Sequence, residues 1–185
     1  MQTNLGNYDM GGYHPGAGLP KRLLWYSVNA LIFHSWWFPG SSLKCALLRT
    51  FGARIGRQVV LKPRINIKYP WHLEIGDHVW LGEGVWIDSL GPVKIGSHVC
   101  ISQEAYLLTG NHNYKLPTFR LMVEGIEIED GAWVGARAVI CPGVRVGNHA
   151  IVTVGSIMTK DAEPNGIYQG NPAQWVRSRT LQGPG

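Results

Sequence analysis

The chain has 185 residues, of which 45% are hydrophobic and 16% are charged, and its formal net charge is +5. This length is enough for one domain with a buried core and short attachments. Three widely spaced cysteines, Cys45, Cys100 and Cys141, argue against a disulfide framework or a cysteine metal site and favour a reducing compartment. Residues 1–20 are polar and rich in glycine, so we expect no signal peptide, and no apolar run reaches the ~20 residues that cross a bilayer.

The positive charge is concentrated at the amino-terminal end. Residues 1–72 contain nine lysines and arginines against one acid, Asp9, which gives +8, whereas the remainder carries −3. Within this basic part, residues 1–20 are predicted to form a loose arm. Residues 21–52 have the apolar pattern of two short helices that are interrupted at Pro39-Gly40.

Six aromatic side chains accompany the two predicted helices: Trp25, Tyr26, Phe33, Trp36, Trp37 and Phe38. They predict a cap over the open end of the repeat that follows, because an uncovered strand edge invites association. The same mixture of aromatic and basic residues also suits contact with an anionic membrane surface, and the two roles are compatible. A nucleic-acid interface is a third alternative, but the segment has no nucleic-acid-binding motif.

From residue 55 onward the chain repeats itself. Ile55, Ile75 and Ile95 open the phrases IGRQVV, IGDHVW and IGSHVC at intervals of 20 residues, and Ile128 and Val146 continue the series 18 residues apart. Within each unit an aliphatic residue returns at every sixth position. A regular internal repeat indicates a solenoid, and a six-residue repeat indicates a parallel β-helix.

A period of six fits neither an α-helix nor a two-faced strand, whose periods are 3.6 and 2.0. It fits three short strands that close a triangular coil, with every sixth side chain pointing to the axis. The sequence therefore predicts an all-β fold, a parallel β-helix of about five coils over residues 55–163. Residues 1–54 would supply the arm and the helical, aromatic cap. We expect the glycines that follow inward residues, such as Gly56 and Gly76, to form the corners.

The repeat is interrupted once, by the segment TGNHNYKLPTFRLMVEG. We predict that residues 109–125 form an inserted loop, and insertions into a solenoid gather on one face that is often the functional one. The turn-rich residues 164–185 are predicted to leave the β-helix as an exit segment.

Three phrases carry a resemblance to a known family: WHLEIGDHVWLGEGVWI, CISQEAYLLTGNHNY and IEDGAWVGA, followed by GNPA at residues 170–173. Over roughly residues 50–178 the chain resembles the hexapeptide-repeat acyltransferases. It is particularly similar to the colanic acid (exopolysaccharide) biosynthesis acetyltransferases of the maltose/galactoside/nodulation acetyltransferase group. The resemblance implies a left-handed winding, acetyl-CoA as co-substrate, no metal, and a homotrimer with active sites between neighbouring prisms. It also implies O-acetyl transfer to a sugar hydroxyl of a polysaccharide precursor.

The inserted loop contains one histidine, His112. The catalytic base of the family that the chain resembles is a loop histidine, and His112 matches it. A sugar hydroxyl is a poor nucleophile until its proton is withdrawn, and imidazole exchanges protons near neutral pH. His78, His98 and His149 each occupy the fourth place of an I/V-G-x-H phrase, so we expect them to be structural corner residues.

By alignment to the family, six residues occupy donor-contact positions: Trp133, Ala136, Val154, Thr159, Lys160 and Arg177. Lys160 and Arg177 are also expected on chemical grounds alone, because the phosphate-rich nucleotide end of acetyl-CoA binds to positive charge. Gln174 stands where the family is expected to have a second arginine. This difference affects the expected contacts to the nucleotide end of acetyl-CoA and not the chemistry of transfer.

Three polar residues are candidates for binding the acceptor: Glu83, Asp88 and Asn111. The family's acceptor-orienting asparagine falls on Gly82 here, which argues against a galactoside or maltose acceptor. The basic, aromatic amino-terminal end suggests a lipid-linked, phosphate-bearing glycan, with a nucleotide sugar as the alternative. This places the expected enzyme in the cytoplasm, with a peripheral contact at the inner face of the cytoplasmic membrane.

Two other functions remain as alternatives. A non-catalytic β-helix scaffold would use the same repeat, although it has no need of the TGNH insertion. A zinc-dependent hydratase of the γ-carbonic-anhydrase kind needs three histidines around the metal. Residues 113–117, which follow His112, contain no second histidine. We therefore expect no metal centre, and we expect no nucleic-acid partner.

Overall fold

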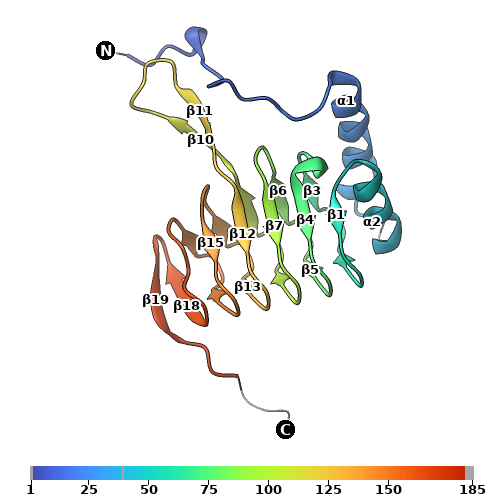
Figure 1. The fold of residues 1–185 in the computed structure, drawn as a ribbon, viewed down its shortest axis with the longest axis vertical. Coiled ribbons are helices and arrows are strands. Elements are labelled where there is room, and N and C mark those ends of the chain that lie inside the picture. Colours follow the sequence, from blue (N-terminus) through green and yellow to red (C-terminus); the bar gives the residue numbers. More distant parts are fainter. Residues whose placement is uncertain (1, 39, 182–185) are drawn as a thin grey trace.

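Short parallel strands stack into a three-sided solenoid over most of the chain (Figure 1). The computed structural model describes residues 2–38 and 40–181. The solenoid confirms the predicted left-handed β-helix, but it has about six turns where about five coils were predicted. The exit segment supplies the last strand of this stack, so the repeat extends beyond the predicted end at residue 163; residues 182–185 of that segment lie outside the described part.

The three sides of the solenoid are three sheets of parallel strands. The first sheet contains β1 (Arg54–Ile55), β4 (Leu73–Ile75), β7 (Val93–Ile95), β12 (Ile126–Ile128) and β15 (Arg145–Val146). The second contains β2 (Val60–Leu61), β5 (Trp80–Leu81), β8 (Cys100–Ile101), β13 (Trp133–Val134), β16 (Ile151–Val152) and β18 (Gly166–Gly170). The third contains β3 (Asn66–Ile67), β6 (Trp86–Asp88), β9 (Tyr106–Leu108), β14 (Val139–Ile140) and β17 (Ile157–Met158). An antiparallel strand, β19 (Ala173–Ser178), pairs with β18 at the carboxyl-terminal end.

The core is the column of aliphatic side chains that the six-residue period predicts. On the second sheet Leu61, Leu81, Ile101, Val134 and Val152 are paired in register from coil to coil, and each is 0% exposed. Burial of a large aliphatic side chain contributes about 1.5–3 kcal/mol. Repetition of such columns therefore holds the coils together.

The glycines after the inward residues serve a different purpose from the predicted one. A Cβ built on Gly56 would lie 2.5 Å from the backbone carbonyl carbon of Gly76, and one on Gly76 would lie 2.7 Å from that of Gly96. These glycines are needed because adjacent coils approach closely. The left-handed corner conformation is instead adopted by residues such as His78 and His98, each with a φ of 58°. This agrees with the corner role predicted for the repeat histidines.

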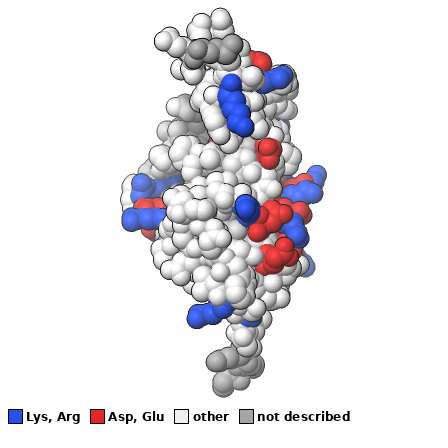
Figure 2. Space-filling view, turned by 90° about the vertical axis from the view of Figure 1, so that its left-hand side faces the viewer, with Lys and Arg blue, Asp and Glu red and all other residues white. Residues whose placement is uncertain are grey.

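The three outer faces of the solenoid differ in chemistry. Outward side chains of the first sheet alternate in charge from coil to coil, and we call this the charged face: Arg54, Glu74, Lys94, Glu127 and Arg145. The corresponding residues of the second sheet are uncharged: Val60, Trp80, Cys100, Trp133 and Ile151. Those of the third sheet are also uncharged: Asn66, Trp86, Tyr106, Val139 and Ile157. In Figure 2 the charged side chains of the first sheet gather along the right-hand edge.

Two helices cover the amino-terminal end of the solenoid. They are α1 (Leu19–Val28), which continues into the single π-helical turn η2 (Asn29–Phe33), and α2 (Ser41–Thr50). Trp25 and Phe33 are buried in the common core, and the Trp25 Nε1–H donates to the Ile67 carbonyl at 2.8 Å. The two helices therefore pack against the strands of the first coil and add aromatic side chains to its core. Gly40 is the residue before α2, while Pro39 of the predicted break lies outside the described residues.

Other side chains of the cap face outward. Tyr26, Trp36 and Trp37 are 72%, 65% and 72% exposed, and Leu23 and Leu31 beside them are also exposed. The Arg64 guanidinium lies 4.5 Å from the Trp36 ring centroid. Covering the solenoid end does not account for these exposed apolar side chains. No helix in residues 2–38 or 40–181 is long and apolar enough to cross a membrane.

Residues 2–18, predicted as a loose arm, follow a defined course. They include the short turn η1 (Leu5–Asn7), run beside the inserted segment and then reach α1 (Figure 1). The Tyr13 hydroxyl donates to the Leu90 carbonyl at 3.1 Å, and the Trp71 Nε1–H donates to the Pro15 carbonyl at 2.6 Å. Trp71 belongs to η3 (Pro70–His72), a turn between the third and first sheets. The polar composition of the arm gave no sign of these contacts.

Candidate active site

The inserted segment is a two-stranded antiparallel hairpin that projects from one corner of the solenoid (Figure 1). Its strands are β10 (Gly110–Asn113) and β11 (Arg120–Val123), and we call residues 110–123 the finger. The finger leaves the third sheet after β9 and returns to the first sheet at β12. The prediction placed a loop at residues 109–125, and the structure gives this loop a regular pairing of four residues with four.

The imidazole of His112 is oriented by groups of the finger itself. Its Nδ1 lies 3.2 Å from the Phe119 carbonyl oxygen, and its ring is stacked on the Phe119 ring with centroids 4.4 Å apart and an angle of 11°. A carbonyl oxygen only accepts hydrogen bonds, so Nδ1 must carry the hydrogen in this contact. The lone pair of a neutral ring then resides on Nε2, which is the atom available to take a proton.

Asp88 lies buried at the base of the finger. The Lys68 Nζ is 3.2 Å from its Oδ1, and the Thr109 hydroxyl donates to its backbone carbonyl. Burial, together with the negative charge of Asp88, raises the pKa of the neighbouring Tyr106 hydroxyl to about 12. Burial also raises the pKa of the Tyr13 hydroxyl, with further contributions from Tyr69 and Asp88. A phenol with the ordinary pKa of about 10 is already neutral at pH 7, so these shifts only extend the neutral form to more alkaline pH.

The three residues predicted to bind the acceptor are only partly brought together. Asp88 ends β6 directly beneath the finger, and Asn111 is on β10, where its Oδ1 accepts from the His112 backbone N–H at 2.8 Å. Glu83 lies at another corner, between the second and third sheets. The structure thus groups Asp88 and Asn111 with His112 and leaves Glu83 apart.

Two of the predicted donor residues share a groove with Glu83. Ala136 and Val154 occupy successive coils, joined through the hydrogen bond from the Gly155 N–H to the Ala136 carbonyl at 2.9 Å. The groove has a volume of about 400 Å³, and its other lining residues include Trp36, Arg64, Glu104 and Arg137. Trp133 precedes this corner on the outer surface of β13, where its Nε1–H donates to the Ser102 hydroxyl at 2.9 Å.

The remaining donor residues lie elsewhere on the same chain. Thr159 and Lys160 follow β17 at the corner where the third sheet gives way to the first, and both are exposed. Arg177 is exposed on β19, opposite Ile167. Ala136 and Val154 therefore lie where the chain enters the third sheet, before β14 and β17. Thr159 and Lys160 lie at the opposite edge of this sheet, after β17. The lining of the groove at Ala136 and Val154 does not include Thr159, Lys160 or Arg177.

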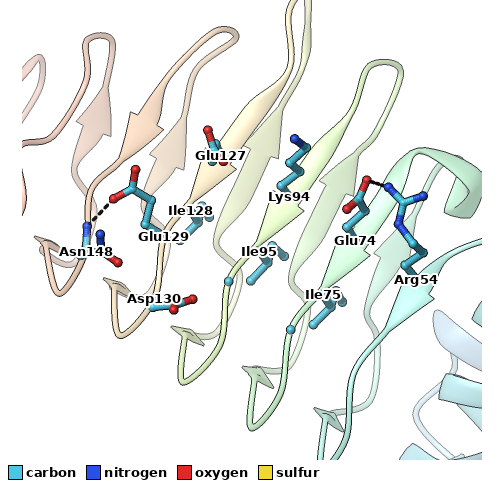
Figure 3. Close-up of a pocket in the computed structure, with 12 residues that line it drawn as sticks. Arg54, Glu74, Ile75, Lys94, Ile95, Glu127, Ile128, Glu129, Asp130 and Asn148 are labelled. Atoms are coloured by element: carbon cyan, nitrogen blue, oxygen red, sulfur yellow. Dashed lines mark hydrogen bonds and ion pairs between the residues drawn. The ribbon is translucent and has the colours of Figure 1, made fainter.

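A larger groove of about 460 Å³ lies on the charged face (Figure 3). Arg54 pairs with Glu74, and Glu129 accepts from the Asn148 backbone N–H at 2.8 Å. None of the residues predicted to act in catalysis or binding lines it. Its lining carries four carboxylates, Glu74, Glu127, Glu129 and Asp130, against the two cations Arg54 and Lys94, and this excess of negative charge does not suit the anionic acetyl-CoA. Among residues 2–38 and 40–181, no three His, Cys, Asp or Glu side chains are arranged to hold a metal ion.

Two contacts of the His112 ring could not be predicted from the sequence. The first is Phe119, whose carbonyl and ring orient His112 and whose own φ is +47°. The second is the arm, whose Tyr8 ring lies with its centroid 5.8 Å from that of His112. No periodicity or motif marks either residue, since both contacts arise from the folding of irregular segments onto each other.

Sequence comparison identifies relatives of known class. No protein-family model matches the chain. The protein named colanic acid biosynthesis acetyltransferase WcaF of Escherichia coli K12 is 37% identical over 166 residues, which cover 89% of this chain and 90% of WcaF. The galactoside O-acetyltransferase of the same organism is 28% identical over 135 residues, which cover 71% of this chain and 66% of that relative.

Structural comparison identifies the same fold in solved proteins. A hexapeptide-repeat-containing acetyltransferase of Vibrio cholerae, complexed with acetyl coenzyme A, matches with a TM-score of 0.81 at 24% identity, covering 96% of this chain and 98% of its own. A galactoside acetyltransferase in complex with coenzyme A matches with a TM-score of 0.76 at 24% identity, covering 87% and 82% of the two chains. Because the chain is 37% identical to WcaF over 89% of its length, it belongs to the colanic acid biosynthesis acetyltransferases of the hexapeptide-repeat acetyltransferase family.

Proposed function

We propose that the protein transfers acetyl from acetyl-CoA to a sugar hydroxyl of a polysaccharide precursor, with Nε2 of His112 as the general base. The observation that carries this proposal is the contact between Nδ1 and the Phe119 carbonyl, which leaves Nε2 as the basic atom. The fold of the finger supports it further, because it presents this ring outside the solenoid, where two substrates can reach it.

The reaction follows from the position of that nitrogen. Nε2 takes the proton of the acceptor hydroxyl while the hydroxyl oxygen bonds to the thioester carbonyl carbon. The tetrahedral intermediate then breaks its carbon–sulfur bond, and the departing thiolate receives the proton from the imidazolium. Base assistance of this kind contributes roughly 10²–10⁴ in rate.

We propose that the donor site is completed by a neighbouring subunit of a homotrimer. Two groups of donor residues lie on different corners of one chain, and packing of prisms side by side would bring unlike corners together. The uncharged outer faces of the second and third sheets support this arrangement, since extended apolar surface on a soluble protein usually marks a contact. The charged face is then the one that meets water.

Within such a site, each predicted donor residue has a role that its chemistry suits. The small residues Ala136 and Val154 would border the pantetheine arm beside the ring of Trp133. Lys160 and Arg177 are exposed cations, which suit the phosphates of the nucleotide end. Thr159 would add a hydroxyl next to Lys160.

The acceptor is proposed to lie against Asp88 and Asn111, which flank the base of the finger. Glu83 is a weaker candidate, since it lines the groove with Ala136 and Val154 instead. The similarity to WcaF, named for colanic acid biosynthesis, supports an exopolysaccharide precursor as the acceptor. The exposed aromatic cap supports a lipid-linked form of this precursor, approached from the inner face of the cytoplasmic membrane.

The direct test is release of coenzyme A thiol from acetyl-CoA by the purified full-length chain, in the presence of lipid-linked oligosaccharides or nucleotide sugars. The proposal expects acceptor-dependent thiol release and a product heavier by one acetyl group in mass spectrometry. Absence of thiol release with every acceptor would instead support a non-catalytic solenoid.

A further inference from the structure

The amino-terminal arm is bound to the tip and outer edge of the finger. The Asn4 N–H donates to the Pro117 carbonyl at 2.9 Å, and the Asp9 N–H donates to the Thr118 carbonyl at 3.2 Å. In return, the Leu121 N–H donates to the Asp9 carbonyl at 2.8 Å. These three backbone hydrogen bonds join segments more than 100 residues apart in the sequence, and Figure 1 shows the arm running alongside β11.

Side chains reinforce this backbone contact. Nε of Arg120 on β11 lies 3.1 Å from the Asp9 Oδ2. Gly11 has a φ of +64°, and a Cβ built there would lie 2.8 Å from a backbone oxygen of β11. The Tyr8 ring packs against the His112 ring in a tilted arrangement, with a centroid distance of 5.8 Å and an interplanar angle of 59°. The arm therefore meets the finger through hydrogen bonds, an ion pair and an aromatic contact.

The position of these contacts matters for the proposed base. The two arm bonds to Thr118 and Leu121 bracket Phe119, whose carbonyl holds Nδ1 of His112. Phe119 itself adopts a left-handed backbone conformation that a bulky residue rarely occupies without support. An arm that fixes both sides of this residue also fixes the carbonyl that sets the tautomer of the imidazole.

The finger needs such support because an isolated two-stranded hairpin is only marginally stable in water. Its own pairing has only four residue pairs, and it projects away from the stacked coils (Figure 1). A displacement of about 1 Å in a catalytic group can cost on the order of 10² in rate. A base carried on an unsupported hairpin would therefore spend much of its time out of position.

The arm is itself anchored to the solenoid. Beyond the finger, its Tyr13 hydroxyl binds the Leu90 carbonyl, and its Pro15 carbonyl accepts from the Trp71 indole. It then enters α1 of the cap. The arm thus connects the finger to the rigid body of the molecule along a second route, separate from the finger's own two strands.

We propose that residues 2–13 are a strut that orders the finger, and that Tyr8 is a positioning residue that confines the His112 ring between itself and Phe119. This inference rests on the proposed function for its effect on catalysis. The strut itself is a physical contact that can be tested whether or not His112 is the base.

The catalytic test compares three variants of the full-length chain in the thiol-release assay. Tyr8→Ala is expected to lower kcat at least about tenfold, while the acetyl-CoA KM changes less than about twofold, because Tyr8 acts through the orientation of His112. Tyr8→Phe should restore most of kcat, since the ring makes the contact. Leu5→Ala is the matched control: it also truncates an apolar side chain of the arm, and Leu5 is 64% exposed. Wild-type kcat in Tyr8→Ala would overturn the positioning role.

The structural test is amide hydrogen exchange of the finger, followed by mass spectrometry. Tyr8→Ala should raise exchange in residues 110–123 and leave the core strands β5 and β8 unchanged, whereas Leu5→Ala should change neither. Because Tyr8 is 41% exposed, its truncation leaves the solenoid core intact. If Tyr8→Ala raises amide exchange in the finger but the wild-type chain transfers no acetyl group, the strut is supported and the proposed function is wrong. Unchanged finger exchange would remove the strut, whatever the activity.

Discussion

Lys160 is an exposed cation at the corner after β17, and its proposed partner is a phosphate of the donor nucleotide. A charge-assisted hydrogen bond contributes about 1.5–3 kcal/mol, so its loss weakens binding about tenfold or more. Lys160→Ala should therefore raise the acetyl-CoA KM by about this factor and change the acceptor KM much less. Steady-state kinetics with each substrate varied in turn measures both constants.

Lys94→Ala is the control for that experiment, because Lys94 is an exposed lysine on the charged face, away from every proposed donor contact. It should leave both constants at the wild-type values. A Lys160→Ala enzyme with a raised acceptor KM and an unchanged acetyl-CoA KM would assign this lysine to the acceptor and remove it from the donor site.

Among the elements, the helical cap combines a buried side with an exposed apolar one. Trp36 and Trp37 protrude between η2 and α2, within the part of the sequence, residues 1–72, that carries a formal charge of +8, and the Arg64 guanidinium lies over the Trp36 ring. Truncating both to alanine should weaken binding to anionic vesicles at least about tenfold, since burying a large apolar side chain contributes about 1.5–3 kcal/mol. Sedimentation with vesicles containing phosphatidylserine, compared with neutral vesicles, measures the change.

Trp175→Ala is the matched control for the cap, because Trp175 on β19 is also exposed, at 58%, but lies at the opposite end of the solenoid. Its vesicle binding should equal that of the wild type. If the Trp36/Trp37 double variant also sediments like the wild type, the cap only closes the solenoid and does not contact lipid.

For the whole molecule, the contrast between one charged and two uncharged faces leads to a prediction about assembly. Introducing a charge by Trp80→Arg on the second sheet or Val139→Arg on the third should dissociate the proposed homotrimer, because an unpaired charge buried in an interface is costly. Glu127→Arg on the charged face should not. Light scattering coupled to size exclusion gives the masses. A wild-type chain that elutes as a monomer would contradict the trimer, and variants that stay trimeric with either arginine would contradict the placement of these two faces in its interface.

Much of this architecture could be predicted from the sequence, because the side chains that point into the core of a solenoid recur at a fixed spacing. The inward column from Leu61 to Val152 follows from the period alone, and the interruption of that period located the finger. The role of Gly56 and Gly76 could not be read this way. A glycine required for close approach of coils and one required for a left-handed corner look the same in a sequence.

The environment of His112 could be predicted only in part. Its loop and its type of side chain pointed to a base, but its orientation depends on Phe119 and Tyr8, which no pattern distinguishes from other loop aromatics. Similarly, the six donor positions were assigned one by one from a resemblance. Their separation on two corners is a property of the three-dimensional winding, which a linear alignment does not reveal.

The most direct test of the central claim is the kcat of His112→Ala in acetyl transfer, measured beside His34→Ala, which removes an exposed histidine of the cap. If Nε2 of His112 is the base, kcat should fall about 10²–10⁴-fold in His112→Ala, with unchanged secondary structure and assembly, and His34→Ala should match the wild type. A His112→Ala enzyme that retains kcat to within a few-fold would show that another group withdraws the proton and would contradict the account.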